Sequence, residues 1–220
     1  MGEDRKEAQF RKMTGERIPG LILSLAVPTI ISMIVTAIYN TADTYFVSKL
    51  GTSASGAVGI VMSLMGLIQS LGFMIGMGSG SWMSRLLGEK KDETASGVAA
   101  SGFYFSLVLG LLVAVMGCCF LDPLVGLLGA TETIRPYARE YAQYILYASP
   151  FLIASFTMNK MLCAEGKARF AMIGIASGGV LNMFLDPIFI FGLKLGIAGA
   201  AIATGLSQIV GFCILLYMFV

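Results

Sequence analysis

Two aspartates lie inside long apolar segments, where a charged side chain is costly and therefore indicates a functional site. Asp43 lies near the end of the apolar run 18–47, and Asp186 lies within the run 170–193. Asn40 precedes Asp43 by three residues, and Asn182 precedes Asp186 by four. These spacings place an amide and a carboxylate on one face of each helix. We therefore expect a site at which oxygen atoms from two helices bind a cation.

Two chemistries suit these oxygen atoms. A hard cation such as Na+ binds carboxylate and amide oxygens, by analogy with other hard ions. Alternatively, two close carboxylates in a medium of low dielectric constant repel each other, so that one of them takes up a proton. Structural roles are the competing interpretation: Asp43 would be an interfacial residue at a helix end, and the two asparagines would form hydrogen bonds between helices.

The composition indicates an integral membrane protein. Hydrophobic residues make up 56% of the 220 residues and charged residues 13%, and the mean hydropathy is +0.81. A soluble fold of this length cannot bury so much apolar surface. The sequence contains no histidine, and its four cysteines lack metal-ligand spacing. We therefore expect no cofactor apart from the cation itself, membrane lipid as the surroundings, and no nucleic-acid partner.

Six apolar segments predict six transmembrane helices. Each exceeds the ~20 residues that cross a bilayer core, and the runs are continuous rather than alternating, which excludes a β-barrel. A charged, basic leader at 1–17 precedes them, and the mixed segment 121–140 leaves room for a short interfacial helix. We expect an all-α polytopic membrane protein with helices at about 18–47, 55–84, 94–120, 137–163, 170–193 and 197–220.

The basic residues predict the orientation of these helices. Eleven of the fifteen Lys and Arg residues lie in the leader or flank the second and fourth connections, and four lie on the opposite side. By the positive-inside rule, both termini are cytoplasmic. At ~1.5 Å rise per residue, Asp43 lies roughly 33 Å along from Leu21, and Asp186 roughly 24 Å along from Phe170. Both acids then fall in the outer half of the membrane, at a similar depth.

Prolines and glycines modify these helices. Pro28 should bend the first helix, and Pro187 should leave the carbonyl of Met183 without its helical donor, directly beside Asp186. A simple kink is the alternative interpretation of Pro187. The glycine clusters at 72–80 and 174–179 predict close packing between helices.

Three motifs, together with the proline in the first helix, resemble the multidrug and toxin extrusion (MATE) transporters. They are YNTADTYFVSKLG, YAQYILYASPF and GGVLNMFLDPIFIFGLKLGIAGAAIAT. The resemblance covers about residues 15–220 and is specific, because the N-x-x-x-D-P and G-x-x-G-A-A-x-A-T elements occur in the family's order and spacing. Family members have twelve helices in two six-helix lobes, so the chain resembles the first lobe alone.

This resemblance implies a secondary antiporter, not an enzyme, in the cell's inner (plasma) membrane. It would export small organic cations and drugs in exchange for inward Na+ or H+, by alternating access. The implied cation site consists of Asp43, Asn182, Asp186 and Thr204, with Tyr141 beside it; Asn40 is added from its position on the helix face. For the substrate cavity between the lobes we expect Tyr39, Met33 and Gln69, because aromatic and Met side chains suit flat lipophilic cations.

Other functions make different demands on the sequence. A flippase for lipid-linked oligosaccharide or polyprenyl phosphate, from a related superfamily, requires a basic cavity, and no Lys or Arg is expected in mid-helix. A channel would need a selectivity filter, and an intramembrane enzyme a catalytic motif that the sequence lacks. No second copy of the lobe follows Val220. We therefore expect a fragment, a truncated reading frame, a half-size transporter that pairs, or a non-transporting assembly partner.

Overall fold

Long helices that run side by side make up the described part of the chain. The computed structural model describes Gly15 and residues 18–219, and this described part contains no strand, which confirms the predicted all-α class. The predicted leader, apart from Gly15, lies outside the described residues. The elements are α2 (Ile18–Ser48), α3 (Thr52–Gly88), α4 (Asp92–Cys119), α5 (Leu121–Leu127), α6 (Arg135–Ala164), α7 (Ala168–Pro187), the π-helical turn η1 (Ile188–Gly192) and α8 (Gly196–Phe219).

Five of the described helices are long and apolar enough to cross a membrane: α2, α3, α4, α7 continued by η1, and α8. The sixth predicted span, α6, does not meet that test of composition although it has 30 residues. The expectation that every segment is sufficiently apolar is therefore wrong for α6. Contacts with other helices explain part of the difference, because Ser149, Thr157 and Asn159 of α6 donate hydrogen bonds to α4, α3 and α7.

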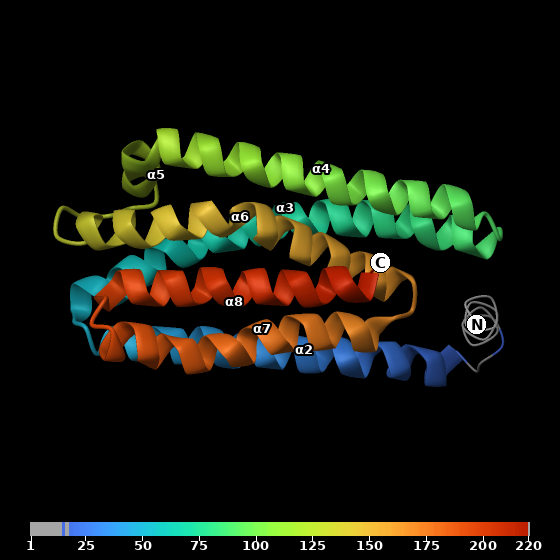
Figure 1. Ribbon diagram of the computed structural model, residues 1–220, viewed down its shortest axis with the longest axis horizontal. Helices are drawn as coiled ribbons and strands as arrows, with labels where there is room; N and C mark the ends of the chain where they lie inside the picture. Colours follow the sequence, from blue (N-terminus) through green and yellow to red (C-terminus); the bar gives the residue numbers. More distant parts are fainter. Residues whose placement is uncertain (1–14, 16–17, 220) are drawn as a thin grey trace.

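Helix α6 is the centre of the bundle. It packs against α3, α4, α7 and α8, and Figure 1 shows it between α4 on one edge and α2 and α7 on the other. Its contact with α3 depends on glycine: a Cβ atom on Gly72 would lie 2.8 Å from the Cβ of Phe156 and 2.9 Å from the carbonyl oxygen of Ile153. The 72–80 cluster thus packs closely, as predicted.

The two prolines have different local effects. Helix α2 continues through Pro28 without interruption, and the hydroxyl of Ser32 donates to the Pro28 carbonyl at 3.0 Å. At Pro187 the α-helix ends and a π-helical turn follows, in which the Leu193 N–H donates to the Ile188 carbonyl. Single π turns in longer helices are rare and frequently mark functional sites.

The remaining connections are short. The predicted short helix in 121–140 is present as α5, which packs against α4 and α6; its interfacial position stays a prediction. Helix α2 packs chiefly against α7, with smaller contacts to α3 and α8, and much of its surface is exposed. It therefore lies at the edge of the bundle and carries Asp43 inward from there.

Candidate functional site

Asp43 and Asp186 both point into the protein. Asp43 of α2 is 6% exposed, and Asp186 of α7 is fully buried. The Tyr141 hydroxyl, from the central helix α6, donates to Asp43 Oδ2 at 3.0 Å. Removing two carboxylates from water is expensive unless other groups compensate them. Such burial does not fit the alternative interpretation of Asp43 as an exposed residue at a helix end.

Asn182 and Thr204 complete the cluster around Asp186. The Asn182 amide nitrogen donates to Asp186 Oδ1 at 3.0 Å and lies 3.2 Å from Thr204 Oγ1. Asn182 and Asp186 are one helical turn apart on α7, as the sequence spacing indicates. Thr204 comes from α8, whose small residues allow a close approach: a Cβ atom on Gly199 would lie 2.7 Å from the Phe189 carbonyl oxygen.

The cluster is therefore built by four helices. We call Asp43, Tyr141, Asn182, Asp186 and Thr204 the acid cluster. Tyr141 connects its two halves, because its side chain interacts with both carboxylates and with Thr204. The two carboxylates also interact electrostatically with each other. Residues from α2, α6, α7 and α8 thus meet at one point in the bundle.

Three oxygen atoms of the acid cluster are buried without a hydrogen-bond partner. They are Asp43 Oδ1, Asn182 Oδ1 and Asp186 Oδ2. Neither aspartate forms an ion pair within the described part of the chain. A buried acceptor without a donor costs free energy, more so when it is charged. A bound cation or protons would satisfy these atoms.

The oxygen atoms of the acid cluster suit a hard cation better than a transition metal. Residues 18–219 contain no group of three or more His, Cys, Asp and Glu side chains that could hold a metal ion. The acid cluster instead combines carboxylate, amide and hydroxyl oxygens. Oxygen ligands of this kind suit hard ions, and the same carboxylates can accept protons.

Asn40 was expected in the cation site, but its side chain makes no described contact with the acid cluster. Asn40 lines a separate groove instead. Asn40 thus lines the groove, and its place in the cation site stays a prediction.

The groove lies between α2, α3, α6 and α7 and has a volume of about 250 Å³. Met33 and Gln69, two of the residues expected in a substrate cavity, both line it. Its lining residues are Thr29, Ser32, Met33, Thr36, Ala37, Asn40, Gln69, Phe73, Phe156, Asn159, Lys160, Cys163, Ala168, Ala171 and Ile175.

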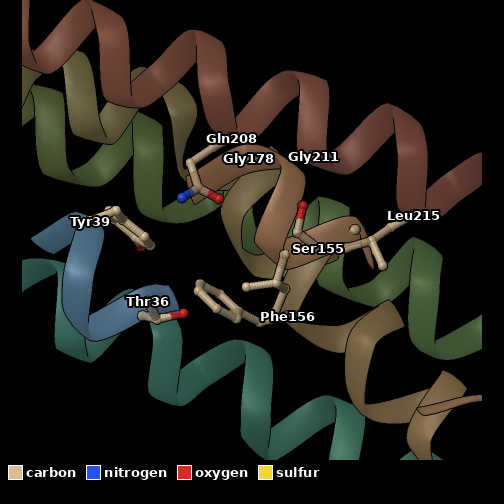
Figure 2. Close-up of a pocket in the computed structure, with 10 residues that line it drawn as sticks. Thr36, Tyr39, Ser155, Phe156, Gly178, Gln208, Gly211 and Leu215 are labelled. Atoms are coloured by element: carbon tan, nitrogen blue, oxygen red, sulfur yellow. The ribbon is translucent and has the colours of Figure 1, made fainter. Parts of the chain in front are cut away.

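Tyr39, the third residue expected in the substrate cavity, does not line the groove. It is 6% exposed and lines a small internal cavity of about 10 Å³, enough for roughly one water molecule. Figure 2 shows Tyr39 and Gln208 at this cavity, with the Ser155 hydroxyl and the Phe156 ring on its α6 side. Thr36, Phe156 and Ile175 line both the small cavity and the groove. Tyr39 thus lines a cavity that shares residues with the groove, and its side chain interacts with Asp43.

Three polar residues near these sites were missed by sequence reasoning. Gln208 interacts with Tyr39, Ser155 has a buried hydroxyl without a partner, and Lys160 lies in the groove. Gln208 was detectable, because it is an amide in an apolar run and lies four residues after Thr204, on the same helix face. Ser155 and Lys160 gave no such signal, since a serine is common in helix packing and Lys160 is close to a helix end.

Comparison with known proteins places this geometry in context. A family model described as MatE matches residues 28–188. The Multidrug export protein MepA of Staphylococcus haemolyticus is 32% identical over 198 residues, which are 89% of this chain and 44% of that relative. The MepA of Staphylococcus aureus is 30% identical over 189 residues, covering 86% and 42%. The chain thus spans less than half the length of these curated relatives.

Solved structures share the fold. A structure of MATE in the bent conformation has a TM-score of 0.85 and 34% identity, and covers 90% of this chain and 44% of that protein. A MOP superfamily transporter from Pyrococcus furiosus, described by the reverse polarity of its binding pocket, has a TM-score of 0.88 and 34% identity, with coverage of 94% and 46%.

Proposed function

The chain belongs to the MatE family, and from this premise we propose that it supplies the ion-binding lobe of a drug exporter driven by Na+ or H+. The curated relatives are multidrug export proteins about twice its length. The proposed transporter therefore combines this lobe with a second one. We further propose that it is not an enzyme and that it lies in the plasma membrane with a cytoplasmic N-terminus, following the distribution of Lys and Arg.

One observation carries the proposal: the acid cluster buries two carboxylates and three oxygen atoms without partners. Without a cation, Asp43 on α2 and Asp186 on α7 repel each other. Binding of Na+ or H+ neutralises this charge and favours close packing of the two helices. An ion shifts a conformational equilibrium only by its differential affinity for the two states, and charge neutralisation in a buried site provides such a difference.

Helix α2 is the element best suited to respond. It lies at the edge of the bundle and packs chiefly against α7, so loss of the ion changes its main contact. Pro28 lacks a helical N–H, and the π turn after Pro187 weakens regular hydrogen bonding in η1. In the proposed mechanism, an ion from outside enters the acid cluster, α2 changes its packing, and the lobes move so that drug leaves and the ion is released inside.

The exported molecule is proposed to bind in the groove. The groove shares Phe156 with the small cavity that contains Tyr39, and Tyr39 interacts with Asp43. A change at the acid cluster can therefore reach the groove through Tyr39 and Phe156. This route would connect ion binding with drug binding inside one lobe.

The test is export by the complete transporter reconstituted in liposomes, with a Na+ gradient or a pH gradient imposed separately. We expect one of these gradients to drive export by the wild type and neither to drive it in Asp186→Asn. Asp122→Asn is the matched control, because Asp122 is exposed and pairs with Arg139 outside the acid cluster. Undiminished gradient-driven export by Asp186→Asn would refute ion coupling at this site.

A further inference from the structure

The wall of the groove is amphiphilic. Along α2 it extends from Thr29 to Asn40, about 16 Å at 1.5 Å per residue. Phe156, Met33 and Ile175 contribute apolar surface, and Asn40 and Gln69 contribute amides. A molecule with a flat apolar body and a polar end fits such a lining. The charge of the groove then decides which polar end it accepts.

Lys160 is the only charged residue that lines the groove in the described part of the chain. Its side chain has a defined position: Nζ lies 4.2 Å from the centroid of the Phe73 ring. The start of the side chain packs against α3 at Gly76, where an added Cβ atom would lie only 2.8 Å from the Lys160 Cβ. The ammonium group thus lies over the Phe73 ring.

No carboxylate balances this ammonium within the groove. Asp and Glu are absent from its lining, and among the described ion pairs none includes Lys160. Asp43 and Asp186 belong to the acid cluster and are not among the residues that line the groove. The groove therefore presents one positive charge and no negative one.

We propose that the groove binds flat organic anions, with their acidic group at Lys160 and their apolar body against Phe156 and Met33. A charge-assisted hydrogen bond from the ammonium fixes the acidic group. An organic cation is disfavoured twice. Lys160 repels it, and the face of Phe73 that would attract it is already covered by the ammonium of Lys160.

This inference rests on the proposed function, because it assumes that the exported molecule binds in the groove. It changes the substrate class, from the organic cations implied by the family resemblance to amphiphilic anions. A lipid flippase, the alternative function considered from the sequence, would also require a positively charged cavity. The proposal commits to a soluble anion, and anionic lipid becomes an outcome of the test.

The experiment measures binding of radiolabelled 2-naphthoate to the full chain in nanodiscs of phosphatidylcholine. We expect saturable binding that 2-naphthylmethylammonium, which has a matched ring and the opposite charge, does not displace. Lys160→Gln should weaken naphthoate binding about tenfold or more, the size expected for one hydrogen bond to a charged group. Lys160→Arg should retain binding, which controls for folding of the altered helix.

Three outcomes would overturn the proposal: equal naphthoate affinity in Lys160→Gln, displacement by the ammonium probe at the same concentration as by naphthoate, or loss of naphthoate binding when phosphatidylglycerol replaces part of the lipid. The last outcome would assign the groove to an anionic lipid headgroup. Asp122→Asn, an exposed change outside both sites, should bind naphthoate like the wild type. Failure of ion-coupled export thus stays distinguishable from failure of anion binding, because this assay requires no gradient and no transport.

Discussion

The acid cluster and the groove are neighbours in one lobe, but they have opposite charge and opposite accessibility. The acid cluster buries two carboxylates and has no basic residue in contact with them among the described residues. The groove is open, contains Lys160 and has no carboxylate in its lining. Tyr39 and Phe156 line a small cavity that shares residues with the groove. The difference indicates that ion binding and drug binding are separate tasks within this lobe.

The largest effect is expected from a substitution in the acid cluster. Asp43→Asn removes a carboxylate that the Tyr141 hydroxyl contacts at 3.0 Å, so the cluster loses one of its two negative charges. We expect gradient-driven export by the complete transporter to fall to the background level, while saturable naphthoate binding to the groove is retained. Parallel loss of both, with wild-type amounts of folded protein, would show that the two sites are one.

Charge reversal at Lys160 tests whether this residue sets the charge preference of the groove. Lys160→Glu places a carboxylate in the groove and removes the ammonium from the Phe73 ring. We expect the preference between the two naphthyl probes to reverse, with the ammonium probe gaining about tenfold or more because a close opposite charge replaces a like one. Competition binding measures this directly. An unchanged order of affinity would mean that the probes bind outside the groove.

A smaller effect concerns the packing that holds both sites in place. Gly72→Ala should destabilise the protein by about 1–3 kcal/mol, the usual cost of overpacking, because its Cβ would meet Phe156 and the backbone of α6. Gly78→Ala is the matched control, since a Cβ atom added there would meet no neighbouring helix within 4 Å. Unfolding in detergent with increasing denaturant compares the two variants. Equal stability would place the close contact of α3 and α6 in doubt.

The smallest effect is expected at Asn40. Asn40→Ala removes one amide from the groove and leaves the acid cluster intact, so naphthoate affinity should fall about threefold, as for one neutral hydrogen bond. The ion concentration for half-maximal export should not change. A shifted ion dependence would return Asn40 to the cation site, where the sequence spacing had placed it.

Sequence reasoning identified the helices and the family because both depend on local patterns. Long apolar runs predict membrane helices, and the motifs around Asp43 and Asp186 carried the resemblance that the family match confirms. The predicted members Tyr141, Asn182 and Thr204 lie in the acid cluster with the two aspartates. Their role in coupling stays a prediction.

The remaining features depend on contacts between distant segments. The polar character of α6 made sense only once its burial among four helices was known. The placement of Tyr39 away from the groove depends on the helices that pack around it, because its position on the α2 face allowed either side. Lys160 was assigned to a connection, since nothing in the sequence shows that Gly76 allows its stem to pack on α3 beside Phe73.

Direct measurement of ion binding tests the central claim, that the acid cluster holds the coupling cation. Binding of radioactive Na+ and uptake of protons after a pH jump can be measured on the purified chain, wild type and Asp43→Asn/Asp186→Asn. We predict that the wild type binds Na+ or takes up protons and that the double variant loses this signal, while Asp122→Asn retains it. The same ion signal in the double variant and the wild type would contradict the account.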